Sequence, residues 1–414
     1  MCIRDSIFHF AHRTFQEYLA ACEIVRCCHE ADSFALLRNL IQSKPQVWRE
    51  PGLLVADVLV ENAHSSDLWQ LVGDLLGDDL PTNVSANDAH WWSLWLAAAI
   101  ADEQGLAAAV PTRRAERTTR EFLRDYIVLL VECPKALLPV ERTFCGRILG
   151  IIGDPRPGVG LRADGLPDIV WCEVPVGDFI MGSEISDTEK PVQVINLATF
   201  YMAKYPVTLA QFQKFVESPD GYTNIRWWDG LNDEGLIQQK NGIARQYLSI
   251  GNYPRVDVSW YESMAFCRWL SANLGYEITL PTEEQWEKAA RSLDGREYPW
   301  GNGYRMGYAN IDESNLDGGG CLQGQTAVGL YPQGASLYGI QDLAGNIGEW
   351  TLTEYSNKLS GNVNNKRNRV IRGGSWFDFS DDVRSSCRIP YKAIDRFDSY
   401  GFRICCRTYP MDKS

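Results

Sequence analysis

Apolar residues in the first third of the chain recur at the three- and four-residue spacing of an amphipathic helix. Phe15, Tyr18 and Cys22 follow this spacing, which places apolar side chains on one helical face. The same period predicts helices over residues 34–42, 51–61, 66–77, 88–109, 114–132 and 138–150. Turn-forming residues such as Pro81 and Pro134 separate several of them. The pattern predicts an all-α helical region over residues 7–150, built from stacked helix pairs.

The hydrophobic pattern changes after a segment rich in glycine and proline. Of the 35 glycines, six precede Ile151, and the composition of residues 151–170 predicts a linker. Beyond it, residues 171–408 show short apolar runs separated by long loops. Three helices are predicted there, over residues 208–216, 259–274 and 282–290, each opening at Thr or Ser. The predicted fold class is α+β, with an all-α region ahead of a domain that has little regular secondary structure.

The charge and the cysteine content narrow the class of protein. The chain has 40 basic and 53 acidic residues and a net charge of −13, whereas nucleic-acid binders usually present a basic stripe. The most apolar long stretch, residues 91–110, contains Asp102 and Glu103, so we expect no membrane-spanning segment and no membrane partner. The twelve cysteines include no C-x-x-C pair and follow no secretory signal, which favours reduced thiols in a cytoplasmic protein.

The positions of histidine and lysine exclude two kinds of chemistry. All five histidines lie within the first 90 residues, so chemistry in the later part must do without imidazole as a base or metal ligand. The chain contains no Gly-Lys dipeptide, and that dipeptide is part of the loop that cradles nucleotide phosphates in P-loop ATPases. We therefore expect no bound nucleotide in this chain.

Two segments near the start of the chain resemble known sequences. The first, MCIRDS, resembles translated sequencing-adapter sequence, so residues 1–6 are expected to be non-native. The second, HFAHRTFQEYLAA (residues 9–21), resembles the end of the NTPase module in NACHT-type signalling ATPases. This resemblance implies that residues 7–150 are the C-terminal part of such an ATPase, whose upstream module is missing from this chain. The alternative is a packed helix in which His9 and His12 simply satisfy their neighbours.

A series of eight motifs runs through residues 179–404. In order they are FIMGS, FYMAKYPVTLAQFQKFV, YPRVDVSWYESMAFCRWL, LPTEEQWEKAAR, YPWGN, LYGIQDLAGNIGEW, RGGSW and SYGFRI. These motifs and their order resemble the formylglycine-generating enzyme (sulfatase-modifying factor) superfamily. The resemblance implies a C-type-lectin-like α+β fold for residues 171–408.

The same resemblance allows the catalytic positions to be compared. Catalytic members carry two cysteines separated by four residues just after RGGSW, and these thiols bind copper(I), a soft ion that needs sulfur. The corresponding residues here are Asp378 and Val383, which are not soft ligands, and the nearest cysteine, Cys387, is expected in the core. A second catalytic branch holds iron with three histidines, and no histidine follows His90. We therefore expect no catalytic residue, no copper and no iron.

Catalytic members of the family also bind calcium, and the resemblance implies two such sites in this chain. The first would use Asn310 and Asp317 with the carbonyls of Ile311 and Gly319. The second would use Asp342 and Glu349 with the carbonyls of Leu343, Gly345 and Ile347. Carboxylates and carbonyls are the hard oxygen donors that calcium prefers. The alternative is that these Asn and Asp residues cap turns without an ion.

Aromatic, arginine and acidic side chains are interleaved in residues 377–400, between the last two motifs. Aromatic and arginine side chains on loops are typical of binding hot spots. Arg384, Arg388 and Arg403 belong to the family framework, so we expect them to be buried partners of acidic residues. We expect ligand contacts among Phe377, Asp378, Phe379, Asp381, Asp382, Ile389, Tyr391, Lys392, Ile394, Asp395, Phe397, Asp398 and Tyr400.

Residues 377–400 also resemble the variable region of proteins diversified by retroelements, and an ordinary, undiversified family member is the alternative. Three functions are compatible with the whole sequence. The first is a non-catalytic module that recognises a protein or another macromolecular ligand and is coupled through the helical region to a signalling ATPase. The second is an oxidoreductase of the family with an altered active site, and the third is a structural assembly domain. The absent cysteine pair and the absent histidines favour recognition.

Overall fold

The computed structural model describes residues 13–62, 65–81, 85, 88–355 and 368–408, without the side chains of Ser65, Asn232 and Asp233. The chain divides into two compact units, Met1–Ile152 and Gly153–Ser414. The segment expected to be non-native (1–6) and residues 9–12 of the NACHT-like motif lie outside the described residues. Within the described part of the chain, every helix is too short or too polar to cross a membrane.

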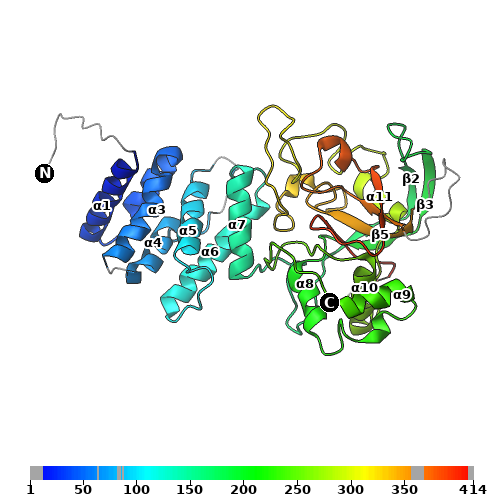
Figure 1. Ribbon diagram of the computed structural model, residues 1–414. Coiled ribbons are helices and arrows are strands. Elements are labelled where there is room, and N and C mark those ends of the chain that lie inside the picture. Colours follow the sequence, from blue (N-terminus) through cyan, green and yellow to red (C-terminus); the bar gives the residue numbers. More distant parts are fainter. Residues whose placement is uncertain (1–12, 63–64, 82–84, 86–87, 356–367, 409–414) are drawn as a thin grey trace. The chain divides into compact units, whose positions relative to one another are not determined.

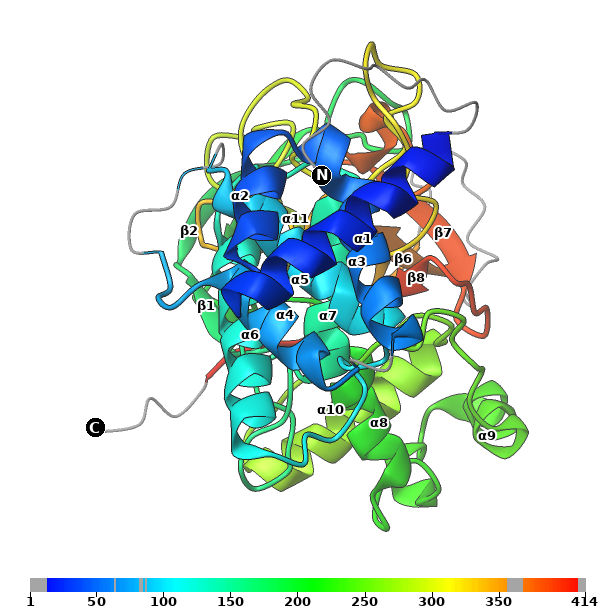
Figure 2. The ribbon, with the colours of Figure 1, turned by 90° about the vertical axis from the view of Figure 1, so that its left-hand side faces the viewer.

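The first unit consists of helices (Figure 1). Their bounds are α1 Arg13–Ala31, α2 Ala35–Ser43, α3 Pro45–Glu61, η1 Ser65–Asp67, α4 Leu68–Leu76, α5 His90–Glu103, α6 Arg114–Glu132 and α7 Pro139–Ile152. The predicted helices correspond to these elements, and the range predicted over residues 114–132 coincides with α6. α1 packs on α3 (Figure 2). α5 contacts α2, α3, α4, α6 and α7 and is buried along most of its length, as its continuous apolar sequence requires.

The described strands of the second unit are short and form three small sheets. Their bounds are β1 Trp171–Val174, β2 Gly177–Met181, β3 Gln193–Leu197, β4 Phe200–Ala203, β5 Gly348–Glu354, β6 Asn368–Arg372, β7 Arg388–Lys392, β8 Tyr400–Gly401 and β9 Cys405–Cys406. β4 lies between β1 and β9, and β2 pairs with β3. In the largest sheet the order is β7-β6-β5-β8, with β5 and β8 parallel and the other pairs antiparallel.

Four α-helices and three short 3-10 helices complete the described part of the second unit. They are α8 Leu209–Glu217, η2 Ile225–Trp227, α9 Asn232–Asn241, α10 Trp260–Leu274, α11 Glu283–Arg291, η3 Pro332–Gly334 and η4 Ser380–Val383. The predicted N-caps are confirmed, because Thr208, Ser259 and Thr282 each accept a hydrogen bond from the third residue of their helix. α9 was not predicted from the sequence, because the apolar residues of NDEGLIQQKN do not recur at helical spacing.

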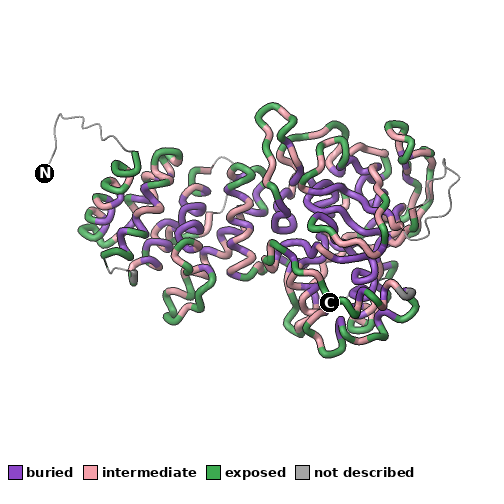
Figure 3. Tube along the Cα trace, in the orientation of Figure 1, coloured by how far each residue is buried: buried purple, intermediate pink, exposed green. Residues whose placement is uncertain are grey.

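Aromatic rings build much of the core that the short strands leave unfilled. Phe212 of α8 stacks on Phe266 of α10 with ring centroids 5.7 Å apart, and Phe402 packs edge-on against both rings. Trp269 and Trp350 belong to the same buried cluster. Figure 3 shows this interior of the second unit as buried chain beneath exposed loops. The expected α+β fold class, with sparse regular structure after an all-α region, is confirmed.

Candidate functional site

The turn that follows β6 shapes the candidate site. Gly373 and Gly374 have φ angles of 93° and 62°, in the left-handed region that glycine adopts without strain. A Cβ atom on Gly374 would lie 2.6 Å from Cγ1 of Val383. The sequence RGGSW therefore turns sharply at its glycines, and the end of η4 packs directly against the turn.

The carboxylate of Asp378 closes this turn. Its Oδ2 accepts hydrogen bonds from the backbone N–H of Ser375 at 2.8 Å and from the Ser375 hydroxyl at 2.7 Å. The Asp378 carbonyl accepts a third bond, 3.0 Å long, from the N–H of Asp312. Burial raises the pKa of Asp378 above its ordinary value, while the bonds from Ser375 oppose the shift. Asp378 is thus a fixed part of the loop.

A cavity of about 350 Å³, here called the turn cavity, lies beside this loop. Its wall consists of Ser186, Thr188, Glu189, Ile371, Gly373, Gly374, Asp378, Asp381, Asp382, Arg384, Cys387, Arg388 and Ile389. Val383 is absent from this wall, because its side chain is fully buried against Tyr298, Ile311 and Ala344. Of the two positions that the family resemblance assigns to the catalytic cysteines, Asp378 therefore borders the turn cavity and Val383 lies in the core.

Cys387 borders the turn cavity and is half-buried, so its predicted place in the core is wrong. The error arises because β7 begins at the next residue, at the edge of its sheet. The thiol lies 3.1 Å from the carbonyl oxygen of Asp381 and 3.5 Å from Oε1 of Glu189. Burial raises the pKa of Cys387 to about 12, so the sulfur is protonated at neutral pH and is a poor nucleophile.

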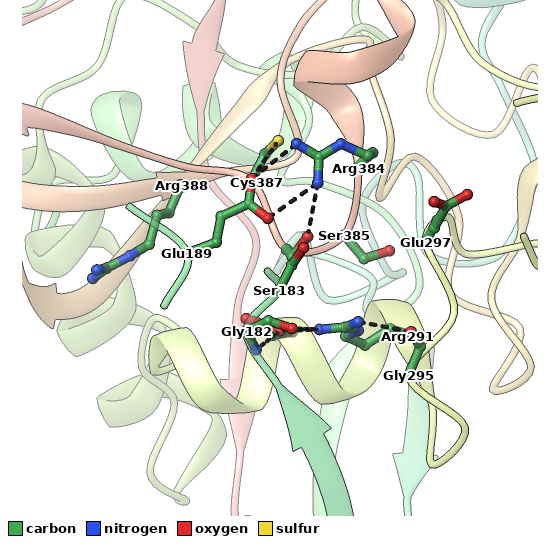
Figure 4. A network of polar contacts seen from close by, with 12 residues as sticks. Gly182, Ser183, Glu189, Arg291, Gly295, Glu297, Arg384, Ser385, Cys387 and Arg388 are labelled. Atoms are coloured by element: carbon green, nitrogen blue, oxygen red, sulfur yellow. Dashed lines mark hydrogen bonds and ion pairs between the residues drawn. The ribbon is translucent and has the colours of Figure 1, made fainter. Parts of the chain in front are cut away.

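Two arginines fix the loop to distant parts of the second unit, as the sequence predicts. Arg384 donates to both carboxylate oxygens of Glu189 at 2.9 and 3.0 Å. Arg388 donates to both oxygens of Glu283 at 2.6 and 2.8 Å. Figure 4 shows Arg384 and the Cys387 sulfur converging on Glu189, while Arg388 points away from them. Each guanidinium is paired within the protein, so neither is an uncompensated charge for a ligand.

A smaller cavity of about 100 Å³ adjoins the turn cavity and shares Glu189 and Arg388 with it. Its wall includes Glu283 and Glu287 of α11 and Arg372 of β6. Arg372 is 1% exposed and donates from Nη2 to both glutamates at 2.6 Å. These buried charges compensate one another, so the network braces β6 against α11.

The end of residues 377–400 forms a cluster of three aromatic rings. Tyr391, Phe397 and Tyr400 contact one another with centroid separations of 4.9 to 5.1 Å. Arg396 anchors this part of the loop by donating to both oxygens of the buried Glu262, at 2.8 and 2.9 Å. Phe397 is 37% exposed, whereas Tyr400 is 3% exposed. Tyr400 therefore supports the other two rings from below and does not reach the surface, contrary to its predicted ligand contact.

The remaining predicted contacts differ in exposure. Phe377, Phe379, Asp381, Asp382, Lys392, Phe397 and Asp398 are exposed, and Asp378, Ile389, Tyr391, Ile394 and Asp395 are half-buried. Ile394 packs against the aromatic core, and Asp395 accepts a hydrogen bond from the N–H of Lys392. Of the predicted contacts, Asp378, Asp381, Asp382 and Ile389 line the turn cavity, and Tyr391 and Phe397 belong to the aromatic cluster. β7 carries Ile389 and Tyr391, one member of each group, on the same side of the strand.

The first predicted calcium set lies in a loop between α11 and β5. Asn310 is buried, and its Oδ1 accepts no hydrogen bond from any described residue. Its amide nitrogen donates to the carbonyl of Gly324 at 2.9 Å. Ile311 is buried, Asp317 is exposed and Gly319 is half-buried. An unpartnered buried oxygen is compatible with a hard cation, so this donor set fits calcium at its Asn310 end.

The second predicted calcium set has a different geometry. Both oxygens of Glu349 accept hydrogen bonds from Arg403 at 2.6 Å, and Oε2 also accepts from Trp286 Nε1 at 2.6 Å. Arg403 further donates to the Asp342 carbonyl at 3.2 Å. The carboxylate of Asp342 accepts from the N–H of Gly329, and burial raises its pKa to about 6.

The residues with the remaining carbonyls of this second set, Leu343, Gly345 and Ile347, are buried around the same turn. The predicted structural role of Arg403 is confirmed by its pairing with Glu349. Its guanidinium already brings positive charge to the oxygens that calcium would need, so this donor set does not fit the ion. Among the described residues, no group of three or more His, Cys, Asp or Glu side chains is arranged to hold a metal.

Sequence reasoning missed Glu189 and the loop around it. Glu189 pairs with Arg384 across 195 positions of sequence, and no motif links the two residues. The only signal available was the expectation that Arg384 has an acidic partner, which does not say which of the 53 acidic residues it is. Ser186 and Thr188, on the same loop, complete the wall of the turn cavity.

The chain is similar in sequence to a known protein family and to several known proteins. Residues 163–408 match the model of the sulfatase-modifying factor enzyme 1-like domain. The chain is 28% identical over 272 residues to a Bos taurus protein named inactive C-alpha-formylglycine-generating enzyme 2, across 56% of this chain and 86% of the relative. It is 29% identical over 271 residues to the hercynine oxygenase of Mycolicibacterium smegmatis, across 56% and 60% of the two chains. The solved structure of PvdO from Pseudomonas aeruginosa superposes with a TM-score of 0.48 at 20% identity, covering 61% of this chain and 99% of that one.

Proposed function

The chain belongs to the family of the sulfatase-modifying factor enzyme 1-like domain, and we propose that its second unit is a non-catalytic recognition module of that family. Membership of this family does not by itself determine the activity, because one relative is named an inactive enzyme and another an oxygenase. The observation that carries the proposal is the pair of residues at the catalytic positions. Asp378 offers a carboxylate there, and Val383 is a fully buried aliphatic side chain, so neither supplies the sulfur that copper(I) needs.

The charges around the turn cavity indicate what kind of ligand it recognises. Asp381 and Asp382 are exposed at its wall. Arg384 and Arg388, also in the wall, are already paired with buried glutamates. Uncompensated negative charge therefore remains at the surface, next to the exposed ring of Phe379. A protein surface that presents lysine or arginine beside an apolar side chain matches this combination.

A peptide library displayed on phage tests the proposal with the full chain as bait. We expect the selected peptides to be enriched in Lys and Arg and to lose binding to the double variant Asp381→Asn/Asp382→Asn. Asp79→Asn, at an exposed position in the first unit, is the matched control and keeps binding. Enrichment of acidic peptides, or equal binding by both variants, would contradict the proposal.

The aromatic cluster provides a second test on the same peptides. Phe397→Ala removes an exposed ring and should weaken binding of the selected peptides while the melting temperature changes little. Tyr400→Ala removes a buried ring from the same cluster and should lower the melting temperature clearly. If Phe397→Ala lowers stability as much as Tyr400→Ala does, Phe397 is part of the core and not of the recognition surface.

An oxidoreductase with an altered site is the competing function, and it makes an opposite prediction. The purified chain is incubated with copper(I), oxygen and a cysteine-containing peptide of a sulfatase, and conversion of the cysteine is followed by mass spectrometry. The recognition proposal expects an unchanged peptide. Conversion that Asp378→Ala abolishes would establish an enzyme. A purely structural assembly domain would instead form stable oligomers without any ligand, which light scattering on the full chain measures.

We further propose that the helical unit couples recognition to a signalling ATPase of the NACHT type in the cytoplasm, and that residues 377–400 are diversified by a retroelement. The resemblance of residues 9–21 supports the coupling, and the resemblance of the loop to variable regions supports the diversification. The gene and its surroundings test both. An ATPase module encoded in frame upstream supports the first, and a template copy that differs at adenines beside a reverse transcriptase supports the second.

A further inference from the structure

A buried arginine remote from the turn cavity has no acidic partner in the described chain. Arg255 is 3% exposed, and its guanidinium lies 5.1 Å from the ring centroid of Phe212. Nη2 donates to the carbonyl of Ala244 at 2.8 Å. Nε has no hydrogen-bond partner among the described residues. Arg255 thus differs from the five other loop and framework arginines described above, each of which is paired with a carboxylate.

The carboxylates of Glu262 and Asp257 attract the Arg255 guanidinium, but neither forms an ion pair with it. Glu262 is occupied by Arg396, which donates to both of its oxygens. Asp257 presents its backbone carbonyl to Nη2 at 3.5 Å. Burial lowers the pKa of Arg255 below its ordinary value, as expected for a cation that lacks a close counter-charge. A buried charge of this kind is costly unless a partner neutralises it.

Arg255 borders a cavity of about 450 Å³ that has a cationic and an apolar side. A second arginine, Arg245, also lines it and is exposed, with no ion pair to any described residue. Leu209, Ala210 and Ile243 supply apolar wall. Asp and Glu are absent from the described lining, although the chain as a whole carries a net charge of −13. The local charge is therefore opposite to that of the rest of the protein.

The loop that carries Arg245 is held in place before any ligand arrives. The side chain of Gln246 is buried and donates to the carbonyls of Leu248 and Pro254 at 3.0 Å each. Its Oε1 accepts a hydrogen bond from the N–H of Val256 at 3.1 Å. The hydroxyl of Ser249 donates to the Gln246 carbonyl at 2.7 Å. Such bonds lower the entropy that would otherwise be lost when a ligand orders the loop.

We propose that this cavity binds a small organic carboxylate, whose carboxylate group pairs with Arg255 and Arg245 and whose apolar part contacts Leu209 and Ile243. A planar guanidinium matches a carboxylate in a two-point hydrogen-bonded pair. The first turn of α8 adds the positive end of its helix dipole. The N–H groups of Leu209 and Ala210 already donate to the carbonyls of Tyr253 and Gly251, respectively. The helix therefore contributes a favourable electrostatic field but no free hydrogen-bond donor from these two residues.

Isothermal titration of the full chain with sodium benzoate tests this site, with inorganic phosphate as a second probe. We expect saturable binding of benzoate that Arg245→Ala weakens about tenfold, the usual effect of losing one charged hydrogen-bonding partner. Arg255→Met should abolish it. Arg114→Ala, an exposed arginine of the first unit, is the matched control and should leave binding unchanged.

The stability of the free variants gives an independent readout. Because Arg255 is buried without an ion-pair partner, Arg255→Met without ligand should melt at or above the temperature of the original chain. The proposal is overturned if benzoate shows no saturable binding, or if phosphate binds and benzoate does not. It is also overturned if binding survives both Arg245→Ala and Arg255→Met. Should Arg255→Met fail to fold, Arg245→Ala still decides, because Arg245 is exposed and its removal leaves the core intact.

Discussion

Replacing Gly374 by alanine tests the geometry on which the proposed function depends, namely that Val383 lies under the turn and not in the turn cavity. The new Cβ would lie 2.6 Å from Cγ1 of Val383, closer than two carbon atoms can approach. The residue would also keep a φ near 62°, a conformation that costs an ordinary side chain about 1–2 kcal/mol. Crowding of a packed core adds about 1–3 kcal/mol. We therefore expect Gly374→Ala to lower the free energy of unfolding by about 3 kcal/mol.

A matched substitution separates these two causes. Gly339 also has a positive φ, 77°, but a Cβ there would meet no atom within 4 Å. Gly339→Ala should therefore cost about 1 kcal/mol, from backbone strain alone. The difference between the two variants measures the contact with Val383. Urea unfolding of the full chain, followed through the transition of the second unit, gives both values.

A double mutant completes the test. Val383→Ala removes the methyl group that the new Cβ would strike, at a cost of about 2 kcal/mol for the cavity it leaves. Combined with Gly374→Ala it should restore about 1–2 kcal/mol relative to the sum of the single effects, as expected for residues in contact. Additive effects would refute the reasoning, since they would mean that residue 383 does not face the turn. Its side chain would then be available to the turn cavity after all.

Other features of the structure lead to three further expectations. The Cys387 thiol, with a pKa of about 12, should be alkylated by iodoacetamide far more slowly than an ordinary thiol between pH 7 and 9, and faster as the pH rises toward 12; rapid labelling at pH 8 in peptide mass spectra would contradict this. Arg396→Met leaves the buried carboxylate of Glu262 without its partner and should cost about 3 kcal/mol in urea unfolding, and an unchanged midpoint would show that the pair is unimportant. Calcium added to chelator-treated protein should raise the melting temperature if the Asn310 set binds it, and Asp317→Asn should remove that increase; the same rise in both proteins would place the ion elsewhere.

Local sequence rules were sufficient for the helices. Thr208, Ser259 and Thr282 cap α8, α10 and α11 because their hydroxyls can reach the N–H groups of the first turn, which is a relation between residues three apart. The same kind of reasoning gave α6 over residues 114–132. The same reasoning did not predict α9, because the apolar residues of NDEGLIQQKN do not form one face of a helix. In α9 the contact with α10, and not the local pattern, accounts for the helix.

The sequence predicted which arginines hold the candidate site together, but it did not predict which side chains of the site are exposed. The arginines at 384, 388 and 403 belong to the framework of the family that the sequence resembles, so a structural role could be inferred before their partners were known. Whether an aromatic side chain in the loop is exposed depends on which strands and helices, distant in sequence, the loop packs against. Tyr400 begins the short strand β8 beside β5 and is buried there, whereas Phe397 precedes that strand and stays at the surface. In the sequence the two rings differ in that Tyr400 belongs to the motif SYGFRI and Phe397 precedes it, which favours a structural role for Tyr400 but does not show its burial.

Arg403 has a consequence for how the second unit responds to its surroundings. A dissolved cation stabilises a fold by an amount that rises with the logarithm of its concentration, and this stabilisation is lost when a chelator removes the ion. The charge that sits among Glu349 and the carbonyls of Gln341 and Asp342 is instead carried on the chain itself. The bend that leads into β5 therefore keeps its positive charge whatever the concentration of free cations around the protein.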